Sequence, residues 1–392
     1  MKSGLHSWLR RPLRRSDFLI CAEVQELDFH RLIQTLRNPP EVSRPVIMPD
    51  FFVDHFVISG SLDSFIESLQ RLAQQGGGNL LGTQQFIRRG GNAANLAAAL
   101  HTLGMNPYLI ATTDAYGSAF LSNLMPEGFD LAHIQTDGRL SSTVSLELEH
   151  EDRHVNLMIS DSGSSADFTF SKLKESDLDA IQGSSLVALL NLNHNKNPLQ
   201  LAQDLFQFTK ESSRALTFMD FGDPSGNPDI IEPLTKALLV GGLVDIVSMN
   251  ENEAAWFAWA LSGRDSSWRE KISDPAKWLE AATFVSNEIG IRIDLHTPLF
   301  TATLLEDECT TQPVFEATPS VACGAGDAWN AGNICGTLYE LNSSERLILS
   351  NAIAALYVSS STASHPSVPE LIGYFQTSPK AKDVDEKLLS SK

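Results

Sequence analysis

The sequence predicts an α/β fold in which a mostly parallel β-sheet is covered by helices on both faces. From about residue 171 onward, short apolar runs take turns with runs whose apolar residues recur at helical spacing. The apolar runs are near-continuous, which is typical of strands buried on both faces. Hydrophobic residues make up 42% of the 392 residues, so the chain can bury a substantial core. Strands that alternate with helices in this way favour a parallel sheet.

The first half of the chain predicts two kinds of β-structure. Residues 45–57 are apolar, aromatic and β-branched and predict an early strand. Residues 61–75 predict a helix that opens on Ser61 as a cap and stops at the glycines 76–78. A short strand at 84–87 is followed by an alanine-rich helix at 92–103. The alternating stretches 143–148 and 155–159 predict a hairpin with one solvated face.

The second half supplies the repeating strand and helix pattern. The predicted strands are 186–190, 215–219, 246–249, 291–295 and 301–305, and the predicted helices are 200–209, 230–239, 251–260 and 275–289. Residues 1–44 are interpreted as an N-terminal extension of unknown role. Residues 379–392 are interpreted as a flexible tail.

Charge and cysteine content limit the classes of partner. The formal net charge of −19 argues against nucleic acid, because a phosphate backbone selects basic surfaces. No apolar run approaches the roughly 18 residues of a membrane span, so no membrane partner is expected. The four cysteines form no CxxC pair, and a disulfide framework is not expected in a chain with this much core. These features favour a reduced, cytoplasmic protein.

The segment Gly324-Ala325-Gly326-Asp327 is the strongest candidate for chemistry. Glycines expose successive backbone N–H groups, and at a helix N-terminus these groups suit a phosphate. An aspartate beside such an anion hole would repel the phosphate. Asp327 is explained if it accepts a proton from an attacking hydroxyl and so acts as a catalytic base. The alternative is that Asp327 caps a helix and the glycines serve the turn.

A second glycine element stands more than two hundred residues earlier. Gly90 and Gly91 precede the alanine-rich helix, and Asn95 lies one turn inside it. Taken alone, this element is also consistent with a tight strand-to-helix turn. The two elements together resemble the two signatures of the PfkB/ribokinase family of carbohydrate kinases. Asn250 and Glu253 resemble the family's NxxE element, and the similarity extends from about residue 45 to 375.

The resemblance implies a fold and a catalytic centre. The implied fold is a ribokinase-like three-layer α/β domain over residues 45–378, with a small β lid built from about residues 55–90 and 140–160. Asp327 would be the base, and the amides of residues 324–327 would form the anion hole. Glu253 and Asn250 would organise Mg²⁺ and water around the phosphates of ATP, with Glu253 acting on the metal through water. Glu253 is also explained as a helix-start residue.

The resemblance also implies binding sites for both substrates. Asp54 would lie at the end of the first strand and bind two sugar hydroxyls, Gly90 and Gly91 would let the backbone approach the sugar, and Asn95 would reach a hydroxyl. Thr297 and Asn351 would line the nucleotide site. Asp54 as a loop residue and Asn351 as a plain helix residue are the alternatives. A homodimer through the lid is expected by resemblance only.

Two departures from the family pattern limit these expectations. Val321-Ala322 replace the family's Asp-Thr pair, which leaves activation by a monovalent cation in doubt. Thr297 and His296, with Pro298, replace a glycine-rich turn. The leading hypothesis is transfer of the ATP γ-phosphoryl group to a sugar hydroxyl. A nucleoside kinase of the same fold is the first alternative, and Phe51 and Phe52 near Asp54 favour it. A kinase-like binding protein without catalysis is the second.

Overall fold

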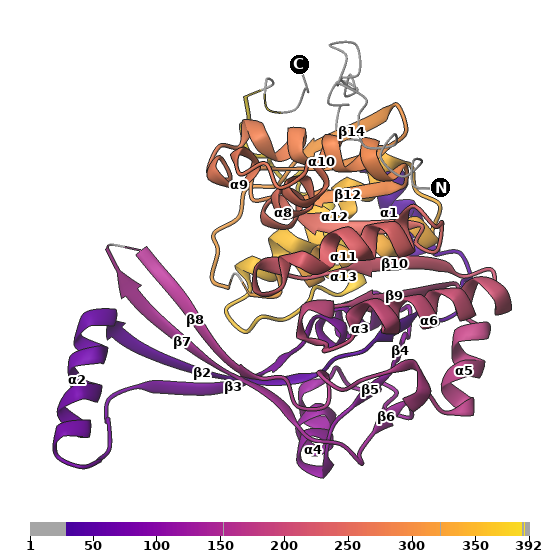
Figure 1. Ribbon diagram of the computed structural model, residues 1–392. Helices are drawn as coiled ribbons and strands as arrows, with labels where there is room; N and C mark the ends of the chain where they lie inside the picture. The colour runs from indigo at the N-terminus through magenta and orange to yellow at the C-terminus, as the bar shows by residue number, and fades with distance from the viewer. Residues whose placement is uncertain (1–28, 152, 322, 386–387, 389–392) are drawn as a thin grey trace, which may run out of the picture.

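The computed structural model describes residues 29–151, 153–321, 323–385 and 388. A large sheet packed between two layers of helices forms the body, and a four-stranded sheet projects from it as a lid (Figure 1). The eight strands of the central sheet lie in the order β14-β13-β12-β11-β10-β9-β1-β4. Neighbouring strands are parallel from β4 to β12. Strand β13 runs antiparallel to both of its neighbours, β12 and β14.

The central strands agree closely with the sequence prediction from β9 to β13, whereas β14 was not predicted. Their bounds are β1 Val46–Met48, β4 Tyr108–Leu109, β9 Leu186–Leu190, β10 Leu216–Asp220, β11 Ile246–Asn250, β12 Arg292–His296, β13 Phe300–Leu305 and β14 Glu308–Pro313. The parallel strands β9–β12 are almost fully buried, as their unbroken apolar runs predicted.

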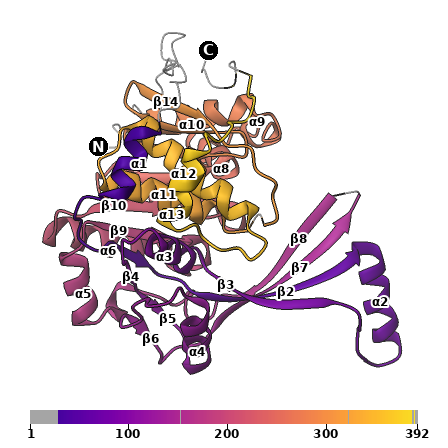
Figure 2. The ribbon, with the colours of Figure 1, turned by 180° about the vertical axis from the view of Figure 1, so that it is seen from behind.

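Helices cover the two faces of the central sheet in separate layers. One core lies against α5 Glu175–Gln182, α6 Pro198–Ser212, α7 Ile231–Leu234, α8 Glu251–Leu261 and α10 Ala276–Ile289. The short α9 is Ser267–Glu270. The other core lies against α1 His30–Arg37, α3 Asn92–Thr102, α4 Ala115–Leu124, α11 Ala325–Leu338, α12 Ser343–Ser359 and α13 Val368–Gln376, which Figure 2 shows from behind.

The lid sheet has the strand order β3-β2-β7-β8. Its strands are β2 Phe52–Ser61, β3 Gln84–Gly90, β7 Ser141–His150 and β8 Arg153–Asp161. Helix α2, Leu62–Gln74, lies at the far end of the lid from the body (Figures 1 and 2). The short strands β5 Ala111–Thr112 and β6 Ile134–Gln135 form a separate pair. The predicted hairpin and the Ser61 cap are both confirmed.

One predicted strand is wrong as a single element. Residues 45–57 divide into β1, which belongs to the central sheet, and β2, which belongs to the lid. The division falls at Pro49, which has no N–H to donate to a ladder. A strand pattern that continues across the break therefore hid the point at which the chain leaves one sheet for the other.

The described residues before 45 and after 378 are more closely packed than the sequence predicted. Helix α1, inside the expected extension, buries Leu32 and Leu36, and the Phe29 ring stacks on Phe375 of α13 at 5.2 Å. In the expected tail, residues 380–382 hydrogen-bond to the backbone of residues 314–316. The expected domain bounds at 45 and 378 are therefore too narrow. Residues 1–28 of the extension lie outside the described residues.

The cysteines also differ in part from the expectation. Cys309 in β14 is disulfide-bonded, whereas Cys323 and Cys335 are free. The expectation of reduced cysteines is therefore wrong at this position. Among the helices of the described residues, none has both the length and the apolar character that a membrane span requires.

Candidate active site

A cavity of about 280 Å³ lies where the carboxyl ends of β9–β12 meet the lid and the start of α11. In open parallel sheets this edge is where ligands bind, because successive loops converge there. Its polar lining residues include Asp54, Asn95, Asn191, Asp220, Asp223, Asn250, Glu253, His296 and Asp327. No lysine or arginine lines it within the described part of the chain.

The predicted anion-hole segment begins helix α11 at this cavity. Gly324 is the N-cap with φ of 86°, a conformation that glycine adopts without strain. A Cβ at Gly324 would lie 2.5 Å from the hydroxyl oxygen of Tyr357, which donates a hydrogen bond to the carbonyl of Cys323. Gly324, Gly326 and Asp327 line the cavity, whereas Ala325 between them does not. A glycine is therefore required at 324 for both conformation and space.

Asp327 lies in the first turn of α11 and is 5% exposed. Burial raises the pKa of its carboxyl well above the ordinary value, and the negative charge of Asp220 raises it further. A hydrogen bond from Asn95 and the charge of Arg89 act in the opposite direction. A carboxyl with a raised pKa is a stronger proton acceptor when ionised, which suits a general base.

Asn95 contacts the candidate base. Its Nδ2 donates to Oδ2 of Asp327 at 3.0 Å, and its Oδ1 accepts from Nε of Arg89 at 3.1 Å. The sequence analysis expected Asn95 to reach a sugar hydroxyl. Asn95 does line the cavity, but both heteroatoms of its side chain have protein partners.

Asp54 lies within lid strand β2 and not at the end of the first strand as expected. It lines the cavity and is 8% exposed, and burial raises its pKa to about 6. Asp50 occupies the position after β1. Its two carboxylate oxygens accept hydrogen bonds from the backbone N–H of Ala93 and from Nδ2 of Asn191, so it anchors the start of α3.

Gly90 and Gly91 were expected to let the backbone approach the sugar. In the structure, both glycines make room for other groups of the protein. A Cβ at Gly90 would lie 2.2 Å from the carboxylate of Asp54, so Gly90 makes room for that side chain. Gly91 has φ of 86°, and a Cβ there would lie 3.0 Å from Oδ2 of Asp50 and from the backbone of residues 51 and 52. Gly91 lines the cavity and Gly90 does not.

Asn250 and Glu253 lie together at the start of α8. They form a capping box: the Glu253 carboxylate accepts from the N–H and Nδ2 of Asn250, and Asn250 Oδ1 accepts from the N–H of Glu253. Both residues line the cavity. Burial and the charge of Asp220 raise the pKa of Glu253 well above its ordinary value. Glu253 is therefore both a helix-start residue and part of the site.

Thr297 and Asn351 are not brought to the cavity. The Thr297 hydroxyl donates to the carbonyl of Phe300 at 2.6 Å in the turn between β12 and β13. Asn351 accepts from the indole N–H of Trp329 and donates to the carbonyl of Pro313. Both side chains therefore form hydrogen bonds to other groups of the protein. Of Val321-Ala322, the departure that bears on a monovalent cation, Ala322 lies outside the described residues.

Several lining residues were missed by sequence reasoning. Three of them stand at the carboxyl ends of parallel strands: Asn191, Asp220 and His296. Because ligands bind at that edge of a parallel sheet, their positions in the sequence could have identified them as site residues. Asp220 accepts from Nδ2 of Asn330 at 2.7 Å, and burial raises its pKa to about 6. Nε2 of His296 is buried without a hydrogen-bond partner, and burial lowers the pKa of this ring to about 4. A neutral imidazole therefore faces the anion-hole segment.

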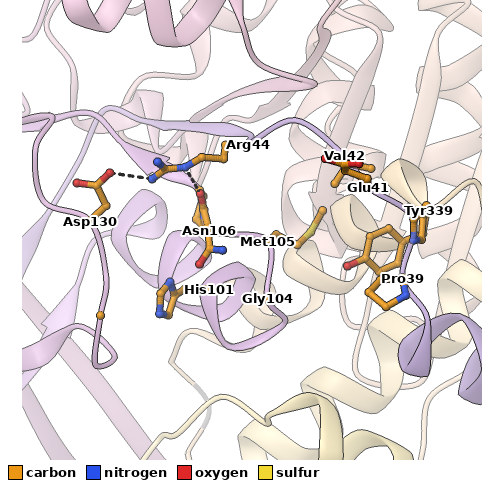
Figure 3. A pocket seen from close by; sticks show the side chains of 13 residues that line it. Pro39, Glu41, Val42, Arg44, His101, Gly104, Met105, Asn106, Asp130 and Tyr339 are labelled. Carbon is orange, nitrogen blue, oxygen red and sulfur yellow. Dashed lines mark hydrogen bonds and ion pairs between the residues drawn. The ribbon is translucent and has the colours of Figure 1, made fainter.

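A larger cavity, of about 540 Å³, lies elsewhere, against residues 39–44 and the turn after α3 (Figure 3). Its arginine, Arg44, is already paired with Asp130 at 2.9 Å and with the carbonyl of Asn106 at 2.6 Å. Among the described side chains, the buried polar atoms that lack a partner all lie outside this lining. The smaller cavity is therefore the stronger candidate for the active site.

Comparisons with known proteins agree with this fold. The family model described as pfkB family carbohydrate kinase matches residues 61–289, more than half of the chain. A search of curated proteins found no match. The chain belongs to the pfkB family of carbohydrate kinases, and it is a kinase.

Solved structures show the same fold at low sequence identity. The ribokinase of Arabidopsis thaliana, determined with ribose and ATP, is 16% identical with a TM-score of 0.65, over 85% of this chain and 98% of that one. The nucleoside kinase of Burkholderia thailandensis, determined with inosine, is 14% identical with a TM-score of 0.59, over 85% and 98%. The adenosine kinase of Sinorhizobium meliloti is 15% identical with a TM-score of 0.61, over 86% and 100%.

Proposed function

We propose that this kinase transfers the γ-phosphoryl group of ATP to a hydroxyl of a sugar or nucleoside, with Asp327 as the base. The observation that carries the proposal is the position of Asp327. Its buried carboxyl lies at a glycine-rich helix start and lines a cavity that residues of the lid also line. Similarity to kinases solved with ribose and ATP, and with inosine, supports these substrate classes.

The proposed reaction follows from the placement of these groups. Asp327 accepts the proton of the acceptor hydroxyl as that oxygen forms a bond to the γ-phosphorus, and the bond to the β–γ bridging oxygen breaks to release ADP. The N-terminal amides of α11 stabilise the negative charge on the transferring group, helped by the helix dipole. Asp54 binds the acceptor from the lid side.

The carboxylates of the cavity fit a divalent cation. Asp220, Asp223 and Glu253 line it without a neighbouring lysine or arginine in the described lining, so a triphosphate would face like charges. Mg²⁺ bound to the phosphates would offset that repulsion. Within the described residues, no three His, Cys, Asp or Glu side chains converge to hold a metal directly. Glu253 would therefore act on Mg²⁺ through water.

The base assignment is tested with Asp327→Asn, which keeps the size of the side chain and removes the proton acceptor. Because positioned acid–base groups contribute about 10²–10⁴-fold, we expect kcat to fall by that factor. Phosphoryl transfer from ATP is measured with ribose, adenosine and inosine as acceptors. Asp229→Asn, at an exposed ion pair with Arg264, is the control and should keep the parent rate. A rate near the parent's for Asp327→Asn would show that another group is the base.

A nucleoside acceptor is the second candidate. Phe52 lines the cavity with its ring centroid 5.1 Å from that of His194, and Met158 lines the lid side, so apolar and aromatic contacts are available for a base. Binding to the native state raises thermal stability. A larger thermal shift with adenosine or inosine than with ribose, each measured with an ATP analogue, would favour the nucleoside. Without a shift from any nucleotide, the non-catalytic binding protein would be the better interpretation.

We also propose a homodimer formed through the lid. Ile87, Val144 and Ile159 are 43%, 37% and 63% exposed, and they lie in one row across the lid sheet through His55. Alternation along each strand puts this row on the face opposite the cavity-lining residues Asp54, Thr143 and Ser160. An exposed apolar face on a sheet is a typical protein interface.

A cytoplasmic location stays a prediction.

A further inference from the structure

Arg89 joins the root of the lid to the body. It is the last residue but one of lid strand β3, directly before Gly90 and Gly91. Its guanidinium donates to Oδ1 of Asn95 at 3.1 Å and to the carbonyl of Leu124 at 2.8 Å, and its Nη2 is 3.2 Å from Nε2 of His365. All three groups are parts of the body, so Arg89 is held by hydrogen bonds on several sides.

The bond from Arg89 fixes the orientation of the Asn95 amide. A guanidinium has only donors, so the amide atom that faces Arg89 must be the acceptor Oδ1. The Nδ2 group is then turned toward Oδ2 of Asp327, at 3.0 Å. An asparagine without this partner could present its oxygen to the carboxylate instead. Arg89 therefore acts on Asp327 through a chain of two hydrogen bonds.

Arg89 is also a positive charge that opposes the effect of the acidic residues around Asp327. Asp220 from β10 and Asp50 after β1 both disfavour a charged Asp327, and Glu253 and Asp54 line the same cavity. The histidines on this side, His296 and His365, are neutral because burial lowers the pKa of each.

Cys323 and Tyr357, which also interact with Asp327, carry no positive charge. Burial raises the pKa of the Cys323 thiol to about 12 and raises that of the Tyr357 hydroxyl, so both are neutral. Arg88, the other lid arginine, lies over the Phe86 ring at 4.6 Å. Arg89 keeps its charge, since its pKa, although lowered by burial, is about 10.

We propose that Arg89 is a positioning residue that, through Asn95, orients Asp327 and keeps its carboxylate ionised as the proton acceptor. The role of Asp327 as proton acceptor rests on the proposed function. The interaction of Arg89 with Asp327 through Asn95 does not depend on that function, because the fold itself forms it. Arg89 and Asn95 thereby connect lid strand β3 to Asp327 through hydrogen bonds between protein groups alone.

The coupling is tested without substrate by urea unfolding at pH 5 and pH 8. Four proteins are compared: the parent, Arg89→Met, Asp327→Asn and the double variant. A group with a raised folded-state pKa loses its stabilising contribution as the pH rises through that pKa. Loss of Arg89 raises the pKa of Asp327 further, so the destabilisation by Arg89→Met should be larger at pH 8. Each unit by which the pKa rises changes the folded-to-unfolded ratio by up to about tenfold, so the measured increase reports the size of the coupling.

In the Asp327→Asn background this increase with pH should disappear. Titration of His365, which also faces Arg89, is common to both backgrounds and cancels in the comparison. Arg88→Met is the matched control and should show no such dependence on Asp327. An equal increase in both backgrounds would overturn the proposal. If Arg89→Met does not fold, Arg89→Lys, which keeps the charge without the planar fork, replaces it with a smaller expected effect.

Catalysis gives the second readout. The acid limb of the kcat/KM profile, measured with the best acceptor among ribose, adenosine and inosine, should move to higher pH in Arg89→Met. It should move less in Arg89→Lys and stay in place in Arg88→Met. An unmoved acid limb together with an inactive Asp327→Asn would refute the role of Arg89 and leave the base assignment standing. An active Asp327→Asn would refute the base assignment, while the unfolding comparison still decides the coupling.

Discussion

The side chains of the cavity share one electrostatic property. Burial raises the pKa of Asp54, Asp220, Glu253 and Asp327, because a charged carboxylate is poorly solvated there. The described lining offers no lysine or arginine to compensate. The site is therefore arranged so that a bound cation, or a hydroxyl that donates hydrogen bonds, stabilises the ionised form of these groups.

Gly90 provides a test of the acceptor side of this site. Gly90→Ala places a Cβ 2.2 Å from the Asp54 carboxylate, which must move. Loss of one hydrogen bond to a charged group costs about 1.5–3 kcal/mol, so KM for the acceptor should rise by about 10- to 100-fold. Steady-state kinetics at saturating ATP measures this change.

The matched control for this substitution is Gly226→Ala. Neither glycine has a positive φ, and a Cβ at Gly226 has no heavy atom of another residue nearby. KM should therefore be unchanged in the control. An unchanged KM in Gly90→Ala would show that Asp54 does not bind the acceptor.

At the residue scale, the sequence predicted the members of the site better than their contacts. Asp327, Glu253, Asp54 and Asn95 all line the cavity. Two glycine elements and one NxxE pattern marked three of them, and Asp54 was marked by its expected place after the first strand. The partners of Asn95 could not be predicted. Arg89 and Asp327 are 238 positions apart (327 − 89), and only the packing of α3 against α11 brings them to the same amide.

Two helices show why an amphipathic pattern alone does not predict burial. Helix α1 buries Leu32 completely and Leu36 to 5% exposure. Helix α2 has apolar residues at helical spacing too, but none of its side chains is buried, and Ile66 and Leu69 are 42% and 46% exposed. The pattern was clear in residues 61–75, whereas no element was predicted at α1. Tertiary position decides which apolar stripe is covered.

This contrast predicts different effects for equivalent substitutions. Leu32→Ala leaves a cavity in the core under α1 and should lower the free energy of unfolding by about 2–5 kcal/mol. Leu69→Ala in α2 should change it by less than about 0.5 kcal/mol, the usual limit for surface positions. Urea unfolding of the two variants measures both. Equal small effects would mean that α1 is not part of the cooperative fold.

The buried parallel strands of the body and the lid hairpin were both predictable, whereas the change of sheet was not. Strands β9–β13 were found because a strand buried on both faces forms an unbroken apolar run. The change of sheet between β1 and β2 was missed, since three consecutive residues of the boundary, Pro49 to Phe51, do not interrupt the hydrophobic pattern enough to reveal it. Strand order in the two sheets depends on pairing between distant segments, which no local pattern contains.

On the scale of the whole molecule, the lid has one face toward the cavity and one apolar face without cover in the described chain. Its four strands project from the body with α2 at the far end (Figure 1). A sheet with an uncovered apolar face loses the stabilisation that burial of that face would supply. Association of two lids would bury the row of Ile87, Val144 and Ile159 in both copies.

The dimer is tested with the double variant Val144→Lys and Ile159→Glu. These residues are direct neighbours on β7 and β8, so the new opposite charges attract each other across the strands and the monomer's own lid should remain folded. Each charge would be buried in a lid interface, which is costly, so the parent should sediment as a dimer and the variant as a monomer. Leu305→Glu, at a 41% exposed position on β13 outside the lid, should stay dimeric. A monomeric parent at micromolar concentration would show that the apolar face does not pair two copies.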